Sequence, residues 1–167
     1  PGMSFGTGRH ATSRFCLRQL DRLRESGQPQ SLLDAGCGSG ILTVAAVKLG
    51  YQPLVAFDLD DACILTTREN LCRNGVDAHA VRLFREDVRL LVLRQRFAVV
   101  TANLEMPLLR TCRERFASLL QPHGALVAAG ILTEEYPILR EAYVADGWTE
   151  EATEPEDGWT GAVFRRN

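Results

Sequence analysis

Residues 32–40 read Leu-Leu-Asp-Ala-Gly-Cys-Gly-Ser-Gly, an apolar run that ends in three glycines at alternate positions. Glycine has no Cβ, so a strand that turns into a helix here can bring its backbone close to a ligand. A second apolar run, residues 54–57, ends at Asp58, where an acid can bind the hydroxyls of a ribose. A nucleoside-binding site explains both the glycines after the first strand and the acid after the second. An ordinary glycine-rich turn explains only the glycines.

The spacing of the glycines separates this loop from two phosphate-binding loops. A dinucleotide fingerprint, G-x-G-x-x-G, needs its third glycine where this chain has Ile41. A P-loop needs G-K-[ST], which does not follow. The pattern from Gly36 to Gly40 is G-x-G-x-G, which suits a nucleoside that carries no phosphate. An NAD-dependent enzyme is therefore the weakest alternative.

The composition predicts one soluble globular domain, residues 1–167. Charged residues make up 24% of the chain and the formal net charge is −2, so no general attraction to nucleic acid is expected. No apolar run has the length of a membrane span, and no signal peptide is recognised. Five cysteines without C-x-x-C spacing favour free thiols over disulfides or a metal site. We expect a cytoplasmic protein with no metal, nucleic-acid or membrane partner.

Strand-like and helix-like segments alternate along the chain. The predicted strands are residues 31–35, 54–58, 80–84, 97–102, 125–130, 148–153 and 161–165. The first predicted helix is capped by Thr12 or Ser13 and ends near Gly27, and the others cover residues 41–49, 62–73, 107–120 and 133–146. This alternation predicts an α/β fold with a doubly wound, mostly parallel seven-stranded sheet and a C-terminal antiparallel hairpin.

Five segments follow one another in the order of a known family. They are residues 5–13 (F-G-T-G-R-H-A-T-S), 34–42 (D-A-G-C-G-S-G-I-L), 57–60 (F-D-L-D), 102–104 (A-N-L) and 130–132 (G-I-L). Together they resemble the ribosomal protein L11 methyltransferases, over nearly the whole chain. The F-G-T-G-x-H segment is the most specific of them. The resemblance implies a Rossmann-like class I methyltransferase that uses S-adenosyl-L-methionine (SAM) and releases S-adenosyl-L-homocysteine (SAH).

The resemblance also assigns cofactor-binding residues. By position, the family's contacts fall on Ser13, Gly36, Asp58 and Asn103, with Thr7 and Gly8 at the methionine end. Three further motif residues, Asp34, Gly38 and Gly40, are assigned to the same site. Asp87 follows the third strand, where many class I enzymes bind the adenine amine.

Asn103 is the predicted catalytic residue. Its side-chain oxygen can accept an N–H of an amine at the carboxyl end of a central strand, where open α/β sheets bind their ligands. The alternative is that Asn103 only forms a turn after a buried strand. Glu105 could serve as a base or as a carboxylate that attracts an amine, but we interpret it as a solvated loop acid. Trp159 could form a wall of the substrate cleft, but we interpret it as a residue that covers the terminal hairpin.

The chain departs from the family at two places that bear on the acceptor. Ala98 stands where the family has an acid, and Glu105-Met106-Pro107 replaces small apolar residues. The separate N-terminal recognition domain of the full-length enzymes is also not recognised in this sequence. The leading hypothesis is methyl transfer to nitrogen of a protein, with a ribosomal protein as one candidate substrate. A small-molecule methyltransferase and a non-catalytic SAM-binding module remain alternatives, and the oligomeric state is left open.

Overall fold

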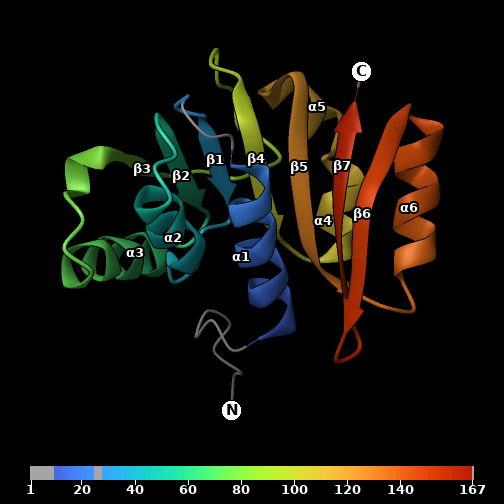
Figure 1. The fold of residues 1–167 in the computed structure, drawn as a ribbon, viewed down its shortest axis with the longest axis horizontal. Coiled ribbons are helices and arrows are strands. Elements are labelled where there is room, and N and C mark those ends of the chain that lie inside the picture. The colour runs from blue at the N-terminus through green and yellow to red at the C-terminus, as the bar shows by residue number, and fades with distance from the viewer. Residues whose placement is uncertain (1–9, 25–27, 167) are drawn as a thin grey trace.

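The computed structural model describes residues 10–24 and 28–166, which form one seven-stranded sheet of order β3-β2-β1-β4-β5-β7-β6 (Figure 1). The strands are β1 (Leu32–Ala35), β2 (Leu54–Asp58), β3 (Val81–Arg85), β4 (Phe97–Asn103), β5 (Leu120–Leu132), β6 (Trp148–Glu156) and β7 (Trp159–Arg166). The first five strands pair in parallel, and β7 is antiparallel to both β5 and β6. The predicted sheet and its terminal hairpin are confirmed.

Helices cover both faces of the sheet. They are α1 (Ala11–Leu23), α2 (Ile41–Lys48), α3 (Asp61–Arg73), α4 (Met106–Thr111), α5 (Arg113–Leu119) and α6 (Tyr136–Ala145), with a 3-10 turn at Ala78–Ala80. The first three helices pack on one face and the last three on the other, which gives three layers (Figure 1).

The buried core lies on both sides of the sheet because alternate side chains of a strand point to opposite faces. In β1, Leu32 packs with α1, α2 and α3, whereas Leu33 packs with α4, α5 and α6. Both leucines have no exposed surface. Strands buried on both faces read as continuous apolar runs, which is why β1, β2 and β4 are recognisable in the sequence.

Helix boundaries differ from the prediction at several places: α1 ends at Leu23 and not near Gly27, and α6 begins at Tyr136 and not at residue 133. Two other differences have a clear physical reason. Thr12 and Ser13 are buried inside the first turn of α1, and His10 is the residue before it, so neither hydroxyl caps the helix. The Thr12 hydroxyl is instead 2.9 Å from Nδ1 of His10. The single helix predicted over residues 107–120 is two helices, because Cys112 has φ −92° and ψ 8°, outside the α-helical range.

Helix α1 is fixed to the terminal hairpin by ion pairs. Arg14 pairs with Glu156 at 2.9 Å, and Arg18 reaches both Glu154 at 2.8 Å and Glu156 at 3.2 Å. Screening by water makes each of these half-exposed pairs individually weak. Their common effect is to hold the start of α1 beside the start of β7, at the edge of the sheet that carries the candidate site.

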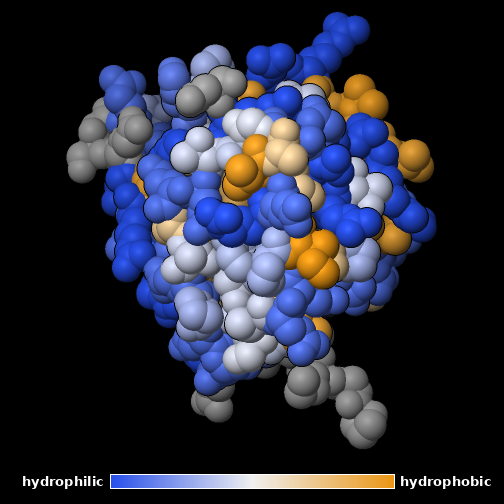
Figure 2. All heavy atoms as spheres, turned by 90° about the vertical axis from the view of Figure 1, so that its right-hand side faces the viewer, coloured by the Kyte–Doolittle hydropathy of each residue, from blue (hydrophilic) through white to orange (hydrophobic). Residues whose placement is uncertain are grey.

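The β6 end of the sheet carries an open hollow of about 400 Å³ on α6, and none of the predicted site residues that the structure describes lines it. Figure 2 views this side, where α6 and β6 lie, and shows a mostly hydrophilic surface with small, separate hydrophobic spots. The edge strand β6 carries several glutamates and Pro155, which oppose pairing with the strand of another chain.

Candidate functional site

A pocket of about 630 Å³ opens at the carboxyl edge of the parallel strands. It is lined by Gly36 and Gly38 after β1, Asp58 at the end of β2, Asp87 after β3 and Asn103 at the end of β4. All five are predicted site residues, brought together because parallel strands end at the same edge. The volume is in the range of pockets that hold small-molecule ligands and cofactors.

The glycine loop and Asp58 form one hydrogen-bonded unit. The main-chain N–H of Gly38 donates to Oδ2 of Asp58 at 2.9 Å, and the N–H of Asp60 donates to Oδ1 at 3.0 Å. Gly36 and Gly38 have φ of 76° and 56°, a conformation that favours glycine. The Asp58 carboxylate is therefore fixed, yet each oxygen keeps a lone pair for a further donor. This arrangement fits a ribose with two adjacent hydroxyls.

Two predicted residues of the same motif do not line the pocket. Asp34 is 1% exposed, and its carboxylate accepts hydrogen bonds from the hydroxyls of Thr43 at 2.5 Å and Thr101 at 2.8 Å. Burial raises the pKa of Asp34. Gly40 ends the loop at φ 79°, where a Cβ would lie within 3.0 Å of Thr67. In the structure, Asp34 and Gly40 therefore stabilise the glycine loop through contacts with the protein interior and do not line the pocket.

The methionine end of the predicted site is described only in part. Ser13 is 2% exposed, lies in the first turn of α1 and does not line the pocket. Thr7 and Gly8 lie outside the described residues. The assignment of these three residues to the cofactor stays a prediction.

Asp87 lines the pocket but already has a strong partner. Its carboxylate accepts from Nη2 of Arg89 at 2.5 Å, from Nε at 3.0 Å on each oxygen, and from the Arg89 main-chain N–H at 2.8 Å. These bonds to Arg89 lower the pKa of Asp87. An adenine amine would have to share this carboxylate with Arg89, and the role of Asp87 at the adenine stays a prediction.

The remaining wall of the pocket contains residues that were not among the predicted site residues. Glu105 and Leu108 follow β4, Gly130 is in β5, and Trp159 begins β7. The interpretation that Trp159 only covers the hairpin is wrong, because this residue lines the pocket. Its ring lies 5.1 Å from that of His10 in an edge-to-face arrangement. The one signal available was its position directly after the tight turn that precedes β7.

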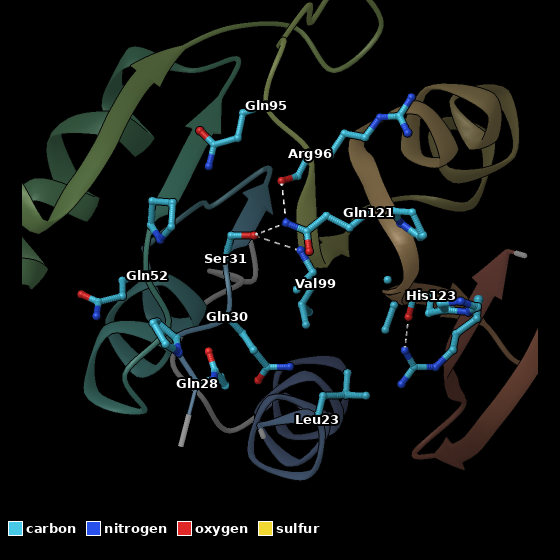
Figure 3. Close-up of a pocket in the computed structure, with 17 residues that line it drawn as sticks. Leu23, Gln28, Gln30, Ser31, Gln52, Gln95, Arg96, Val99, Gln121 and His123 are labelled. Carbon is cyan, nitrogen blue, oxygen red and sulfur yellow. Dashed lines mark hydrogen bonds between the residues drawn. The ribbon is translucent and has the colours of Figure 1, made fainter. Parts of the chain in front are cut away.

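A second hollow, of about 520 Å³, opens at the amino edge of the same strands (Figure 3). Figure 3 shows the side chains of Gln52, Gln95 and Gln121 around it, and Ser31 at its floor. The Ser31 hydroxyl accepts hydrogen bonds from the main-chain N–H of Ala98 and the amide of Gln121. None of the predicted site residues that the structure describes lines this hollow, and open α/β sheets bind ligands at the carboxyl edge.

Residues 10–24 and 28–166 contain no group of three or more His, Cys, Asp or Glu side chains that could hold a metal ion. Across the same ranges, no helix combines the length and apolarity that crossing a bilayer requires.

The strand order, the antiparallel β7 and the nucleoside-sized pocket beside a G-x-G-x-G loop define the fold of a class I, SAM-dependent methyltransferase. The sequence matches the family model "Ribosomal protein L11 methyltransferase (PrmA)" over residues 1–167. The chain belongs to this family, as its motifs predict.

Curated relatives support the same assignment. The chain is 39% identical to the ribosomal protein L11 methyltransferase of Geobacter metallireducens over 166 residues, which cover 99% of this chain and 52% of the relative. It is 37% identical to that of Legionella pneumophila, covering 98% of this chain and 54% of the relative. The chain thus spans about half the length of the curated relatives it matches.

Solved structures agree with the fold. A ribosomal protein L11 methylase from Lactobacillus delbrueckii subsp. bulgaricus matches with a TM-score of 0.88 at 26% identity, over 99% of this chain and 82% of that one. The glycopeptide N-methyltransferase MtfA complexed with sinefungin matches with a TM-score of 0.69 at 13% identity, over 91% and 92% of the two chains. The second likeness concerns the fold alone.

Proposed function

We propose that this chain transfers a methyl group from SAM to a nitrogen atom of a protein, with ribosomal protein L11 as the substrate that the relatives' name suggests. The observation that carries the proposal is a single pocket lined by the glycine loop, Asp58 and Asn103. A nucleoside bound along the loop and Asp58 would place its other end toward Asn103, across the carboxyl edge of the sheet.

Asp58 and the glycine loop supply binding and orientation. The two main-chain N–H groups that fix the Asp58 carboxylate leave it oriented toward the pocket, where it can accept the two ribose hydroxyls. Gly36 and Gly38 present no side chain, so the sugar can pass close to the backbone. When bound, SAM supplies an electrophilic methyl group on a sulfonium.

Asn103 orients the acceptor amine, and the apolar wall of the pocket favours its neutral form. A protonated amine, with an ordinary pKa near 10.4, cannot attack, so it must first lose a proton. Desolvation against Leu104, Leu108 and Trp159 favours that loss, because burial disfavours the charged form. The Asn103 oxygen then accepts a remaining N–H and directs the nitrogen lone pair toward the methyl carbon. Such alignment can contribute roughly 7–11 kcal/mol to a two-reactant step.

Calorimetry separates this proposal from its competitors. We expect heat of binding with SAM and SAH and none with NAD. Asp58→Ala should abolish SAH binding, since the ribose loses its charged acceptor, and Asp61→Ala, an exposed neighbour outside the pocket lining, is the matched control. Wild-type SAH affinity in Asp58→Ala would refute the assigned site.

Transfer itself is measured with SAM labelled in the methyl group and recombinant ribosomal protein L11. Label incorporated into the protein, in a form stable to base as expected for methylated nitrogen, supports the proposal. SAH binding without incorporation into L11 would reject this substrate.

A further inference from the structure

One carboxylate that lines the pocket, that of Glu105, has no side-chain partner among the residues that the structure describes. Asp58 and Glu86 accept hydrogen bonds from main-chain N–H groups, and Asp87 is paired with Arg89. The Glu105 carbonyl accepts main-chain hydrogen bonds from Leu108 and Leu109, but within residues 10–24 and 28–166 its side-chain carboxylate makes no hydrogen bond or ion pair, although it lines the same pocket. Its charge is therefore available to a ligand.

Glu105 is held at the pocket by a tightly packed segment. The preceding Leu104 donates its main-chain N–H to the carbonyl of Ala129 at 3.0 Å. The Leu104 backbone lies so close to Gly130 that a Cβ there would come within 2.5 Å of the Leu104 carbonyl oxygen. The Leu104 side chain occupies the space beside Gly36 in the same way. Asn103 and Glu105, on either side of Leu104, are thus fixed together.

The neighbouring wall of the pocket is aromatic and aliphatic. Leu108 lies in α4, directly after β4, and Trp159 begins β7, so the strand order puts both on the side of Asn103 and away from β2, which carries Asp58. An aromatic face attracts a cation, and an aliphatic side chain packs against a methylene chain. A carboxylate beside such a wall fits a primary ammonium group on an alkyl chain.

We propose that Glu105 determines acceptor specificity by binding the positive charge of an alkylammonium group as it enters the pocket. This inference rests on the proposed function and names its acceptor class: an amine that arrives protonated, on an aliphatic chain. Glu105 attracts the cation at the exposed mouth, and the proton is lost to water before the nitrogen reaches Asn103. Glu105 is a recognition residue and takes no part in bond making.

The test uses the two tryptophans of the chain as reporters in the SAH-loaded protein. Trp159 lines the pocket, whereas Trp148 is 3% exposed and does not line it, so Trp148 is an internal reference. n-Butylammonium and its neutral analogue butan-1-ol are titrated while the two indole N–H signals are followed by ¹⁵N NMR. We expect butylammonium to shift the Trp159 signal at lower concentration than butanol. Glu105→Gln should raise the dissociation constant of butylammonium about three- to fivefold, as for an exposed ion pair, and leave that of butanol unchanged.

Glu141→Gln, an equal charge change at an exposed site on α6, is the matched control and should leave both titrations unchanged. Equal butylammonium affinity in Glu105→Gln and wild type would overturn the inference. A loss of SAM affinity relative to SAH in Glu105→Gln would also overturn it, because the carboxylate would then serve the sulfonium. Wild-type protein that binds no SAH would refute the proposed function itself, whereas SAH binding with butylammonium binding independent of Glu105 would refute this inference alone.

Discussion

At the scale of single residues, glycines shape the pocket by leaving space that another group occupies. The Leu104 side chain fills the space beside Gly36, and the Leu104 backbone fills the space beside Gly130. Gly130 also has a φ of 87°, which L side chains rarely adopt. The segment that carries Asn103 is therefore fixed by two residues that have no side chain.

Gly130→Ala should lower both stability and turnover. The added Cβ would lie 2.5–3.1 Å from Leu104 backbone atoms, so we expect a loss of about 2–4 kcal/mol in the free energy of unfolding, measured in urea. Gly147→Ala is the control, because Gly147 has a similar φ of 82° with open space around it. It should lose only about 1–2 kcal/mol. Equal losses in the two variants would contradict the role of the Leu104 contact.

Asn103→Ala should separate binding from turnover. If Asn103 orients the acceptor, SAH affinity stays close to wild type while kcat falls by about 100-fold, the cost of a misplaced reactant. SAH calorimetry and the labelled-methyl assay are run on the same preparation. Parallel losses of affinity and kcat would instead assign Asn103 to cofactor binding.

At the scale of elements, α1 is placed by its contacts with the terminal hairpin. Its arginines pair with glutamates of β6, and Phe15 packs directly on the backbone of Gly161 in β7. A Cβ at Gly161 would overlap the Phe15 ring. This close approach keeps α1 against the sheet, beside the pocket.

Gly161→Ala should destabilise the protein by about 1–3 kcal/mol, because the buried Phe15 ring must move. The double variant Phe15→Ala with Gly161→Ala should lose less stability than the two single losses added together, since one change makes room for the other. Urea unfolding of the four proteins measures this coupling. Strict additivity would show that Phe15 and Gly161 do not share the strain.

At the scale of the whole molecule, one sheet connects both buried clusters. Leu32 and Leu33 belong to different clusters, so neither side of the sheet can lose its packing alone. This connection is the physical reason to treat residues 1–167 as one domain, which stays a prediction. It also means that a ligand at the sheet edge should stabilise the entire fold.

SAH at 100 times its dissociation constant should stabilise the protein by about 2.7 kcal/mol. For a chain of this length, that is a rise in Tm of roughly 5–11 °C, followed by circular dichroism in a single transition. Asp58→Ala should show no rise under the same conditions. Two separated transitions, only one of them sensitive to SAH, would refute the single domain.

The sequence by itself determined the fold class and the central part of the site. Strands buried on both faces read as apolar runs, and the residues that end them, Gly36, Asp58 and Asn103, must meet at one edge when the strands are parallel. Helix boundaries were less well determined. Threonine and serine commonly cap helices, yet tertiary packing buries Thr12 and Ser13 within the first turn of α1.

Only the tertiary structure decided which residues line the pocket near Asn103 and which residues stabilise the glycine loop from the protein interior. Trp159 reaches the pocket because β7 lies next to β5, and Gly130 fixes Leu104 across two strands. Asp34 turns inward to two threonine hydroxyls and away from the pocket. Each of these contacts joins residues far apart in the chain, and local sequence patterns carry no information about which distant side chains come to share a space.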